Sequence, residues 1–347
     1  MTAAATAASA SAAHGAIVAA LAQSTQHRRY SSPVARWLMT DPQTRDIGRA
    51  VANCALRLAM EAREGPDEAP EARLTAARVC NRRLCPYCEW RRSRVQRARL
   101  LQGVAQLLED QPTVKPVLLT LTQRNVPVEA LGDELGRIHK AWNRLTMRRD
   151  FPSTLWYRRT EITVSTPESR QKAKLDGRNA GKNGGLIDNG EVTLHPHLHC
   201  LLFVRASYFG RDYIKQADWT EKWRQCLGID YSPVVDVRRA YQKGSEGLPS
   251  EMPLGAAMEV SKYITKQSDL PSLGPLVAPF SEAVKGVRMR AVSRPLSRYI
   301  SAAEVQAAEL LDSPLPEASG GSPIVRVVAD WCDSISAYLI TPSEGGA

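Results

Sequence analysis

Apolar and polar residues alternate along two stretches in the middle of the chain, which is the two-residue period of a β-strand. Leucine and threonine alternate in VLLTLT at 117–122, and histidines alternate with other residues at the start of 194–204, which then becomes apolar. Residues 155–165 and 233–239 predict two further strands. The apolar run after the histidines indicates that this strand is buried on both faces, at the centre of a sheet.

Other stretches repeat their apolar residues every three or four positions, which is typical of amphipathic helices. The helices predicted in this way cover residues 46–63, 89–109, 128–149, 217–227, 255–266 and 301–311. Basic residues 287–298 predict an edge strand followed by a turn. The strands at 155–165 and 194–204 are separated by a loop at 166–190, and the simplest pairing of two such strands is antiparallel.

The two ends of the chain lack such periodicity. Residues 1–24 are rich in Ala, Ser and Thr, and we expect them to form a disordered tail. No apolar run is long enough to span a bilayer, and no basic segment precedes the apolar residues as it does in a signal peptide. We therefore expect a cytoplasmic protein without a membrane partner. No pattern indicates an oligomeric state.

The charge of the chain is strongly positive. Its 347 residues include 46 Lys plus Arg against 36 Asp plus Glu, a net charge of +10. Such a charge favours a polyanionic partner such as a nucleic acid, although a basic protein without such a partner has the same composition.

Cysteines are crowded in one short segment. Cys80, Cys85 and Cys88 lie within nine residues, and the pair Cys85-x-x-Cys88 has the spacing of a zinc knuckle. In a chain without an export signal this crowding favours a metal over disulfides. A structural zinc ion needs four ligands, and Cys54 is the first candidate for the fourth, with His27 the second.

Arginines are concentrated in the helix that follows the cysteines. Arg91, Arg92, Arg94 and Arg97 lie around its N-terminal half, where they predict contacts with DNA phosphates. The alternative is a charged helix face that is only solvated.

Three histidines share one face of the central strand. His195, His197 and His199 alternate with other residues, and neutral imidazoles gathered in this way predict a metal site. Antiparallel pairing with the preceding strand would bring Glu161 beside His197 and His199. A site with imidazole and carboxylate ligands can bind Mn²⁺, Mg²⁺ or Zn²⁺. The alternative is a polar strand that faces solvent.

The predicted helix at 255–266 carries a second group of reactive residues. Glu259 and Tyr263 are four positions apart and share a face, with Lys262 and Lys266 beside the tyrosine. Attack of a tyrosine oxygen on a phosphate becomes feasible when a metal polarises that phosphate and a lysine lies nearby. The product would be a phosphotyrosyl–DNA bond.

Together these segments resemble the rolling-circle plasmid replication initiators of the Rep_1 family, which are HUH endonucleases. The resemblance covers roughly residues 45–300 and rests on four motifs in the family order. They are the cysteines Cys80, Cys85 and Cys88 with Cys54 upstream, Leu119–Thr122 with Asn125, the His195–His199 motif and the Glu259–Lys266 motif.

The resemblance implies an α+β fold, with an HUH endonuclease core whose central antiparallel sheet is similar to an RRM or ferredoxin-like fold. Helices would flank this sheet, and a small zinc-binding helical module would precede it. Residues 25–110 would then form a zinc- and DNA-binding helical region and residues 111–305 the catalytic nicking domain. Residues 306–347 would be a C-terminal tail of unknown role.

The activity that the resemblance implies is nicking of one strand at a plasmid double-strand origin. Tyr263 would attack the phosphate and stay joined to the 5′ end, and Glu259 would assist termination. The freed 3′-OH would prime synthesis by host polymerase with a host helicase. His197, His199 and Glu161 would bind Mn²⁺ or Mg²⁺, and the cysteines would bind Zn²⁺. His195 could be a ligand, a group that orients a ligand or a DNA contact.

Several rival functions fit part of the sequence. A transposase or a relaxase would use the same chemistry, although relaxases carry the tyrosine before the histidines. A non-catalytic DNA-binding regulator would use the zinc module and arginines and hold a structural zinc at the histidines. A zinc hydrolase would leave the downstream tyrosine and the positive charge without a role.

Overall fold

A computed structural model describes residues 3–64, 70–175, 190–240, 260, 265–302 and 325–341. The chain divides into two compact units, one formed by residues 1–92 with 308–347 and the other by residues 93–307. Each unit contains helices and one antiparallel sheet, so the protein is of the predicted α+β class.

In its described residues, the first unit contains three helices before α4 and a four-stranded sheet in the order β2-β1-β8-β9. The helices are α1 (Ala3–Arg28), α2 (Ser31–Thr40) and α3 (Arg45–Ala52). The strands are β1 (Arg57–Glu64), β2 (Pro70–Ala77), β8 (Val325–Cys332) and β9 (Ala337–Thr341).

Three expectations for this unit were wrong. The N-terminal segment expected to be disordered is mostly the helix α1, because Ala13, Ile17 and Leu21 form a buried stripe along an alanine-rich sequence with high helix propensity. Two strands, β1 and β2, interrupt the region expected to be helical. The C-terminal residues expected to be a tail supply β8 and β9, and β8 pairs with β1.

The helix predicted at 46–63 covers only α3. It ends where the Asn53 side chain and backbone both bond to the Arg49 carbonyl, and Ala55 then adopts a positive φ of 53°. From Arg57 onward the chain pairs with β2 on one side and β8 on the other. Pairing with two strands overrides the helical propensity of this segment.

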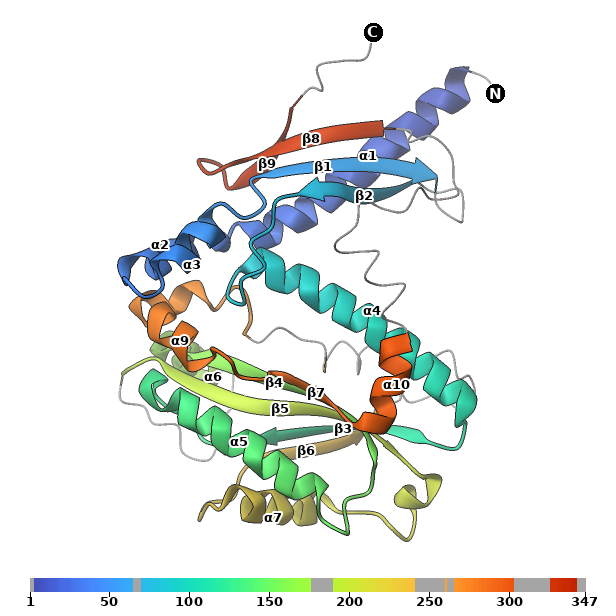
Figure 1. Ribbon diagram of the computed structural model, residues 1–347, viewed down its shortest axis with the longest axis vertical. Coiled ribbons are helices and arrows are strands. Elements are labelled where there is room, and N and C mark those ends of the chain that lie inside the picture. The colour runs from blue at the N-terminus through green and yellow to red at the C-terminus, as the bar shows by residue number, and fades with distance from the viewer. Residues whose placement is uncertain are drawn as a thin grey trace. The chain divides into compact units, whose positions relative to one another are not determined.

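The second unit is built around a five-stranded antiparallel sheet in the order β6-β3-β5-β4-β7 (Figure 1). Its strands are β3 (Lys115–Thr122), β4 (Leu155–Ser165), β5 (Thr193–Val204), β6 (Val235–Arg239) and β7 (Arg290–Val292). Its helices are α5 (Leu131–Thr146), α6 (Pro167–Leu175), α7 (Gln216–Leu227), α9 (Val277–Ala283) and α10 (Arg294–Ala302). Helix α4 (Pro86–Asp110) begins in the first unit and continues in the second.

Helices cover both faces of this sheet. On one face, Trp142 of α5 and Trp219 and Trp223 of α7 are fully buried against β3, β5 and β6. On the other face, α4 and α10 pack on Leu118, Leu201 and neighbouring residues. A Cβ at Gly103 of α4 would lie 3.0 Å from the Ile300 backbone of α10, so glycine lets the two helices approach closely.

The elements predicted for this unit are largely confirmed. The strands at 117–122, 155–165, 194–204 and 233–239 correspond to β3, β4, β5 and β6, and residues 290–292 form the expected edge strand. Most of the predicted helix at 255–266, and of that at 301–311 beyond Ala302, lies outside the described residues.

Candidate functional site

Two neighbouring strands bring three ligand-type side chains together. Glu161 of β4 lies directly opposite His197 of β5, and His199 is two residues further along β5, so all three project from one face. The Glu161 Oε2 atom is 3.0 Å from His199 Nε2 and 3.5 Å from His197 Nε2. The two Nε2 atoms are 3.1 Å apart, and all three residues are buried. The predicted approach of Glu161 to the histidines is therefore confirmed.

The other nitrogen of each histidine is engaged elsewhere. His197 Nδ1–H donates to the His195 carbonyl oxygen at 3.1 Å, so Nε2 is the ring nitrogen that faces Glu161. His199 Nδ1 is 3.3 Å from the Thr120 hydroxyl of β3. Such contacts fix the orientation and the tautomer of imidazoles that bind metals.

The electrostatics of this group favour a cation. Burial acts to raise the pKa of the Glu161 carboxyl, but hydrogen bonds with His197 and His199 outweigh it and hold the pKa well below its usual range. Two imidazole nitrogens that both present lone pairs at 3.1 Å would repel each other unless they shared a proton or a cation.

The distances also fit a divalent metal. Metal–ligand bonds of about 2.1 Å at right angles place two ligand atoms about 3.0 Å apart. The three separations of 3.0, 3.1 and 3.5 Å are close to that value, and the three atoms occupy one side of a coordination sphere. Glu161, His197 and His199 could therefore hold a divalent ion with open positions for other ligands.

His195 lies beside this group but outside it. Its ring centroid is 5.3 Å from that of His197, and the three converging atoms come from the other residues. Burial lowers the pKa of His195 to about 4, so the imidazole is neutral at physiological pH.

The structure describes only part of the predicted tyrosine motif. Glu259, Lys262 and Tyr263 lie outside the described residues, whereas Lys266 is described and exposed. Val260, three positions before Tyr263, is fully buried in a cluster with Leu201 and Phe203. On β5, Leu201 and Phe203 project from the same face as His197 and His199, since side chains alternate along a strand.

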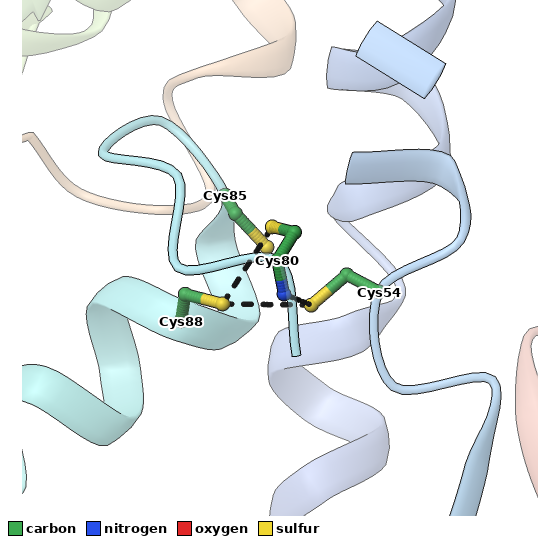
Figure 2. Close-up of side chains that lie close together, drawn as sticks. All are labelled: Cys54, Cys80, Cys85 and Cys88. Atoms are coloured by element: carbon green, nitrogen blue, oxygen red, sulfur yellow. Dashed lines mark hydrogen bonds between the residues drawn. The ribbon is translucent and has the colours of Figure 1, made fainter. Parts of the chain in front are cut away.

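The four predicted cysteines converge in the first unit (Figure 2). Cys54 follows α3, Cys80 follows β2, and Cys85 and Cys88 lie at the start of α4. Their Sγ atoms all lie within 4.8 Å of one another, with Cys54 and Cys88 at 3.5 Å and Cys80 and Cys88 at 3.7 Å. A tetrahedral zinc with bonds of about 2.3 Å separates its sulfur ligands by about 3.8 Å.

The chemistry of the cysteine cluster also fits a metal. A hydrogen bond with Cys54 lowers the pKa of the Cys88 thiol, and the Cys80 backbone N–H donates to Cys54 Sγ at 3.4 Å. The other candidate for the fourth ligand, His27, stacks on Trp90 with 4.6 Å between ring centroids. Cys54, rather than His27, completes the group of four.

The arginines predicted to bind DNA differ in their surroundings. Arg92 pairs with Glu89 and donates to the Asn81 carbonyl at 3.1 Å, so it braces the loop between Cys80 and Cys85. Arg94 is exposed, and Arg91 and Arg97 are half-buried on the same helix. Contacts of these arginines with DNA remain a prediction.

Two residues lie next to the histidines without having been predicted there: Thr120, named only as part of the Leu119–Thr122 motif, and Arg159, which was not named. Thr120 contacts His199, and Arg159 of β4 lies directly opposite His199 on β5. The alternation that selected Glu161 also places Arg159 on the same face, so the same strand pattern could have found it.

None of the helices within the described ranges is long and apolar enough to cross a membrane.

Comparison with known proteins places these features in a family. The profile of a family described as "Replication protein", Rep_1, matches residues 71–339. The chain is 31% identical over 215 residues to "Protein rep" of a Bacillus species, covering 58% of this chain and 62% of the relative. It is 34% identical over 198 residues to "Protein rep" of Lactiplantibacillus plantarum, covering 55% and 54%. It is also 30% identical over 201 residues to "Protein rep" of Staphylococcus aureus, covering 57% and 73%.

The matched segments span about 62% and 53% of the first two curated relatives. No solved structure matches the chain. Because the family profile covers more than half of the sequence, the chain belongs to the Rep_1 family of replication proteins.

Proposed function

We propose that the protein initiates rolling-circle replication of a plasmid by nicking one DNA strand at its double-strand origin. Membership in the Rep_1 family supports a role in replication. The net charge of +10 suits a DNA partner. The observation that carries the proposed chemistry is the convergence of Glu161, His197 and His199 on one sheet face.

The order of elements supports an HUH endonuclease core. Along the chain the elements follow the order β3-α5-β4-β5-α7-β6, and across the sheet the strands follow the order β6-β3-β5-β4. This is the βαββαβ arrangement of ferredoxin-like folds. The histidines lie on the central strand β5, and Val260 of the tyrosine motif is buried against the same face. The proposed nucleophile Tyr263 follows Val260 by three positions.

The proposed reaction is a transesterification. Mn²⁺ or Mg²⁺ held by Glu161, His197 and His199 would polarise the scissile phosphate. The Tyr263 oxygen attacks phosphorus and forms a tyrosyl–phosphate bond to the 5′ end. The bond from phosphorus to the 3′ oxygen breaks, and that oxygen takes up a proton.

The remaining predicted residues have separate parts in this proposal. Lys262 and Lys266 would stabilise charge near the reacting tyrosine, and Glu259 would activate water at termination. The 3′-OH would prime synthesis by host polymerase after a host helicase opens the duplex. The four cysteines would hold a structural Zn²⁺, and the arginines of α4 would contact origin DNA.

A nicking assay tests this proposal. Protein would be incubated with supercoiled plasmid or labelled single-stranded origin oligonucleotides, with Mn²⁺ or EDTA, and resolved on a denaturing gel. We expect a 5′ fragment covalently linked to the protein that requires the metal and is absent in Tyr263→Phe. Tyr213→Phe is the matched control, because Tyr213 is an exposed tyrosine of the same unit.

Metal dependence is tested separately with His199→Ala and Glu161→Gln. Each should lower Mn²⁺ affinity and nicking together, since each removes one of three ligands. Specific binding of origin DNA without cleavage under every metal condition would refute the nickase and favour a DNA-binding regulator.

A further inference from the structure

Two short helices of the first unit form a helix-turn-helix pair. Helices α2 and α3 lie side by side and are joined by residues 41–44 (Figure 1). A turn of three or four residues between two packed helices is typical of the motif whose second helix enters the major groove of DNA. A Cβ at Gly48 of α3 would lie 2.9 Å from both the Ala35 carbonyl oxygen and the Met39 backbone nitrogen of α2. Glycine at this position therefore lets the two helices pack closely.

Hydrogen bonds fix the turn between the two helices. The Gln43 backbone N–H donates to Asp41 Oδ1 at 2.7 Å, and the Thr44 backbone N–H donates to the Asp41 carbonyl oxygen at 3.2 Å. The hydroxyl of buried Thr44 donates to the Leu38 carbonyl oxygen of α2 at 2.7 Å. Because Thr44 directly precedes α3, these contacts fix the start of α3 relative to α2.

The other end of α3 is also held by the fold. The last carbonyl groups of a helix have no partner within it. Buried Arg28 of α1 donates from Nη2 to the Ala52 carbonyl oxygen at 2.8 Å, and a cation at a helix C-terminus is stabilising. The Cys54 backbone N–H donates to the Val51 carbonyl oxygen at 3.2 Å. Helix α3 is therefore positioned at both ends.

One face of α3 is exposed and carries two arginines. Arg45, Asp46 and Arg49 are exposed, whereas Gly48 and Val51 are buried. Arg45 and Arg49 are four positions apart, so they lie on the same side of the helix. Arg45 forms no ion pair with the described residues. Arg49 Nη1 is 3.4 Å from Asp46 Oδ1, but an ion pair between two exposed side chains contributes little, so Arg49 can exchange this acceptor for another.

We propose that α3 binds double-stranded DNA in the major groove, with Arg45 and Arg49 on guanine bases. The inference goes beyond the proposed nicking of one strand and assigns duplex recognition to the first unit. A helix of eight residues is about 12 Å long, and the major groove is about 12 Å wide, so the helix fits the groove. A guanidinium presents paired N–H donors that match O6 and N7 of guanine. Four helical positions rise about 6 Å, which corresponds to about two base-pair steps.

The character of the exposed face favours DNA over a protein partner. The exposed residues of α3 are all charged, with two arginines to one aspartate. The cores of protein–protein interfaces are depleted in charged residues, whereas DNA attracts a basic surface. The net charge of +10 acts in the same direction.

The experiment selects duplexes from a library of random double-stranded oligonucleotides, so the origin sequence need not be known. The full chain is used in a Tyr263→Phe background, so that no cleavage occurs. We expect the selected duplexes to share guanines. Arg45→Gln and Arg49→Gln should each weaken binding of the selected duplex about tenfold or more and abolish the preference at one base pair.

Arg326→Gln is the matched control. Arg326 is an exposed arginine of β8 in the same unit, and the change in charge is identical. This variant should weaken binding of all duplexes equally and by less than about threefold, because it removes general attraction but no base contact. Circular dichroism and thermal unfolding show that each variant is folded, which the exposure of the three arginines favours.

Two results would overturn the inference. One is selection of the same duplex with the same affinity by both α3 variants, which would make α3 a solvated helix. The other is an equal loss of affinity for all duplexes in the α3 variants and in Arg326→Gln, which would leave only general electrostatic attraction. The nickase would stand in either case, because its failure shows separately, as the absence of a protein-linked fragment when Tyr263 is intact.

Discussion

Replacing Cys54 tests whether the cysteine cluster is a structural zinc site with four ligands. Cys54 is distant in sequence from the other three cysteines, with 26 positions to Cys80 and 34 to Cys88. It is also almost completely buried. In Cys54→Ala the metal loses one sulfur, and the loop from residue 54 to residue 80 is no longer closed through the metal.

The expected magnitude follows from this loop. Closing a flexible loop of 26 residues reduces the entropy of the unfolded chain by an amount equivalent to about 3 kcal/mol. Because the metal performs this closure only when Cys54 is present, the free energy of unfolding of the zinc-bound protein should fall by about 3 kcal/mol in Cys54→Ala. The lost Zn–S bond lowers zinc affinity directly. Structural zinc contributes about 10 kcal/mol or more through four ligands, so the loss of one ligand should weaken zinc binding at least about 50-fold.

The assay compares zinc content and affinity in purified proteins. Zinc per chain is measured by mass spectrometry, and affinity by competition with a chromophoric chelator. Cys332→Ala is the matched control, because Cys332 lies on β8 of the same unit but outside the cluster. Full zinc content with unchanged affinity in Cys54→Ala would refute a four-cysteine site, and zinc loss in the control would show that the effect is not local.

Three other substitutions test the packing. Burial lowers the pKa of His139 to about 3 from about 6.5, so the unfolded chain binds the proton more readily and stability falls with pH below 6.5. In urea denaturation between pH 7.5 and 5.0, His139 should account for about 2 kcal/mol of the stability that is lost, and His139→Gln should reduce the loss by that amount. Arg158 is buried without an ion pair to a described carboxylate, and burial lowers its pKa to about 10, so Arg158→Met should raise the free energy of unfolding by up to about 3 kcal/mol in the same assay. Ile17→Ala should destabilise the first unit by about 2–5 kcal/mol and accelerate its tryptic cleavage, whereas a disordered N-terminus would be unaffected.

The sheet of the second unit could be predicted because its signals are local. Strand β4 has the predicted bounds, Leu155–Ser165, and the histidine strand is its neighbour in sequence and in the sheet. A two-residue period and antiparallel pairing were sufficient to bring Glu161 opposite His197. Arg159 lies on the same face by the same alternation, so its place beside His199 could also have been predicted, although its burial could not.

The strands of the first unit could not be predicted because their pairing depends on residues that are distant in the sequence. The segment RLAMEARE of β1 consists mainly of strong helix formers, and its strand state depends on pairing with β8, where Arg57 lies opposite Asp330. Such a partner, more than 250 positions away, leaves no trace in local periodicity. Helix α1 was not predicted because its alanine-rich composition resembles that of a low-complexity tail. Only the burial of Ala13, Ile17 and Leu21 in the structure identifies the face by which this helix packs.

The same long-range pairing bears on the cysteine cluster. The Tyr338 hydroxyl of β9 donates to the carbonyl oxygen of Ala55 at 2.5 Å, directly after Cys54. The Ala55 N–H donates to the Arg78 carbonyl, two positions before Cys80. The C-terminal hairpin and the end of β2 thus fix the residue that follows Cys54. Spacing identified the three local ligands, but the fourth depends on a sheet that the C-terminal residues complete. The segment expected to be a tail is therefore part of what holds the cluster together.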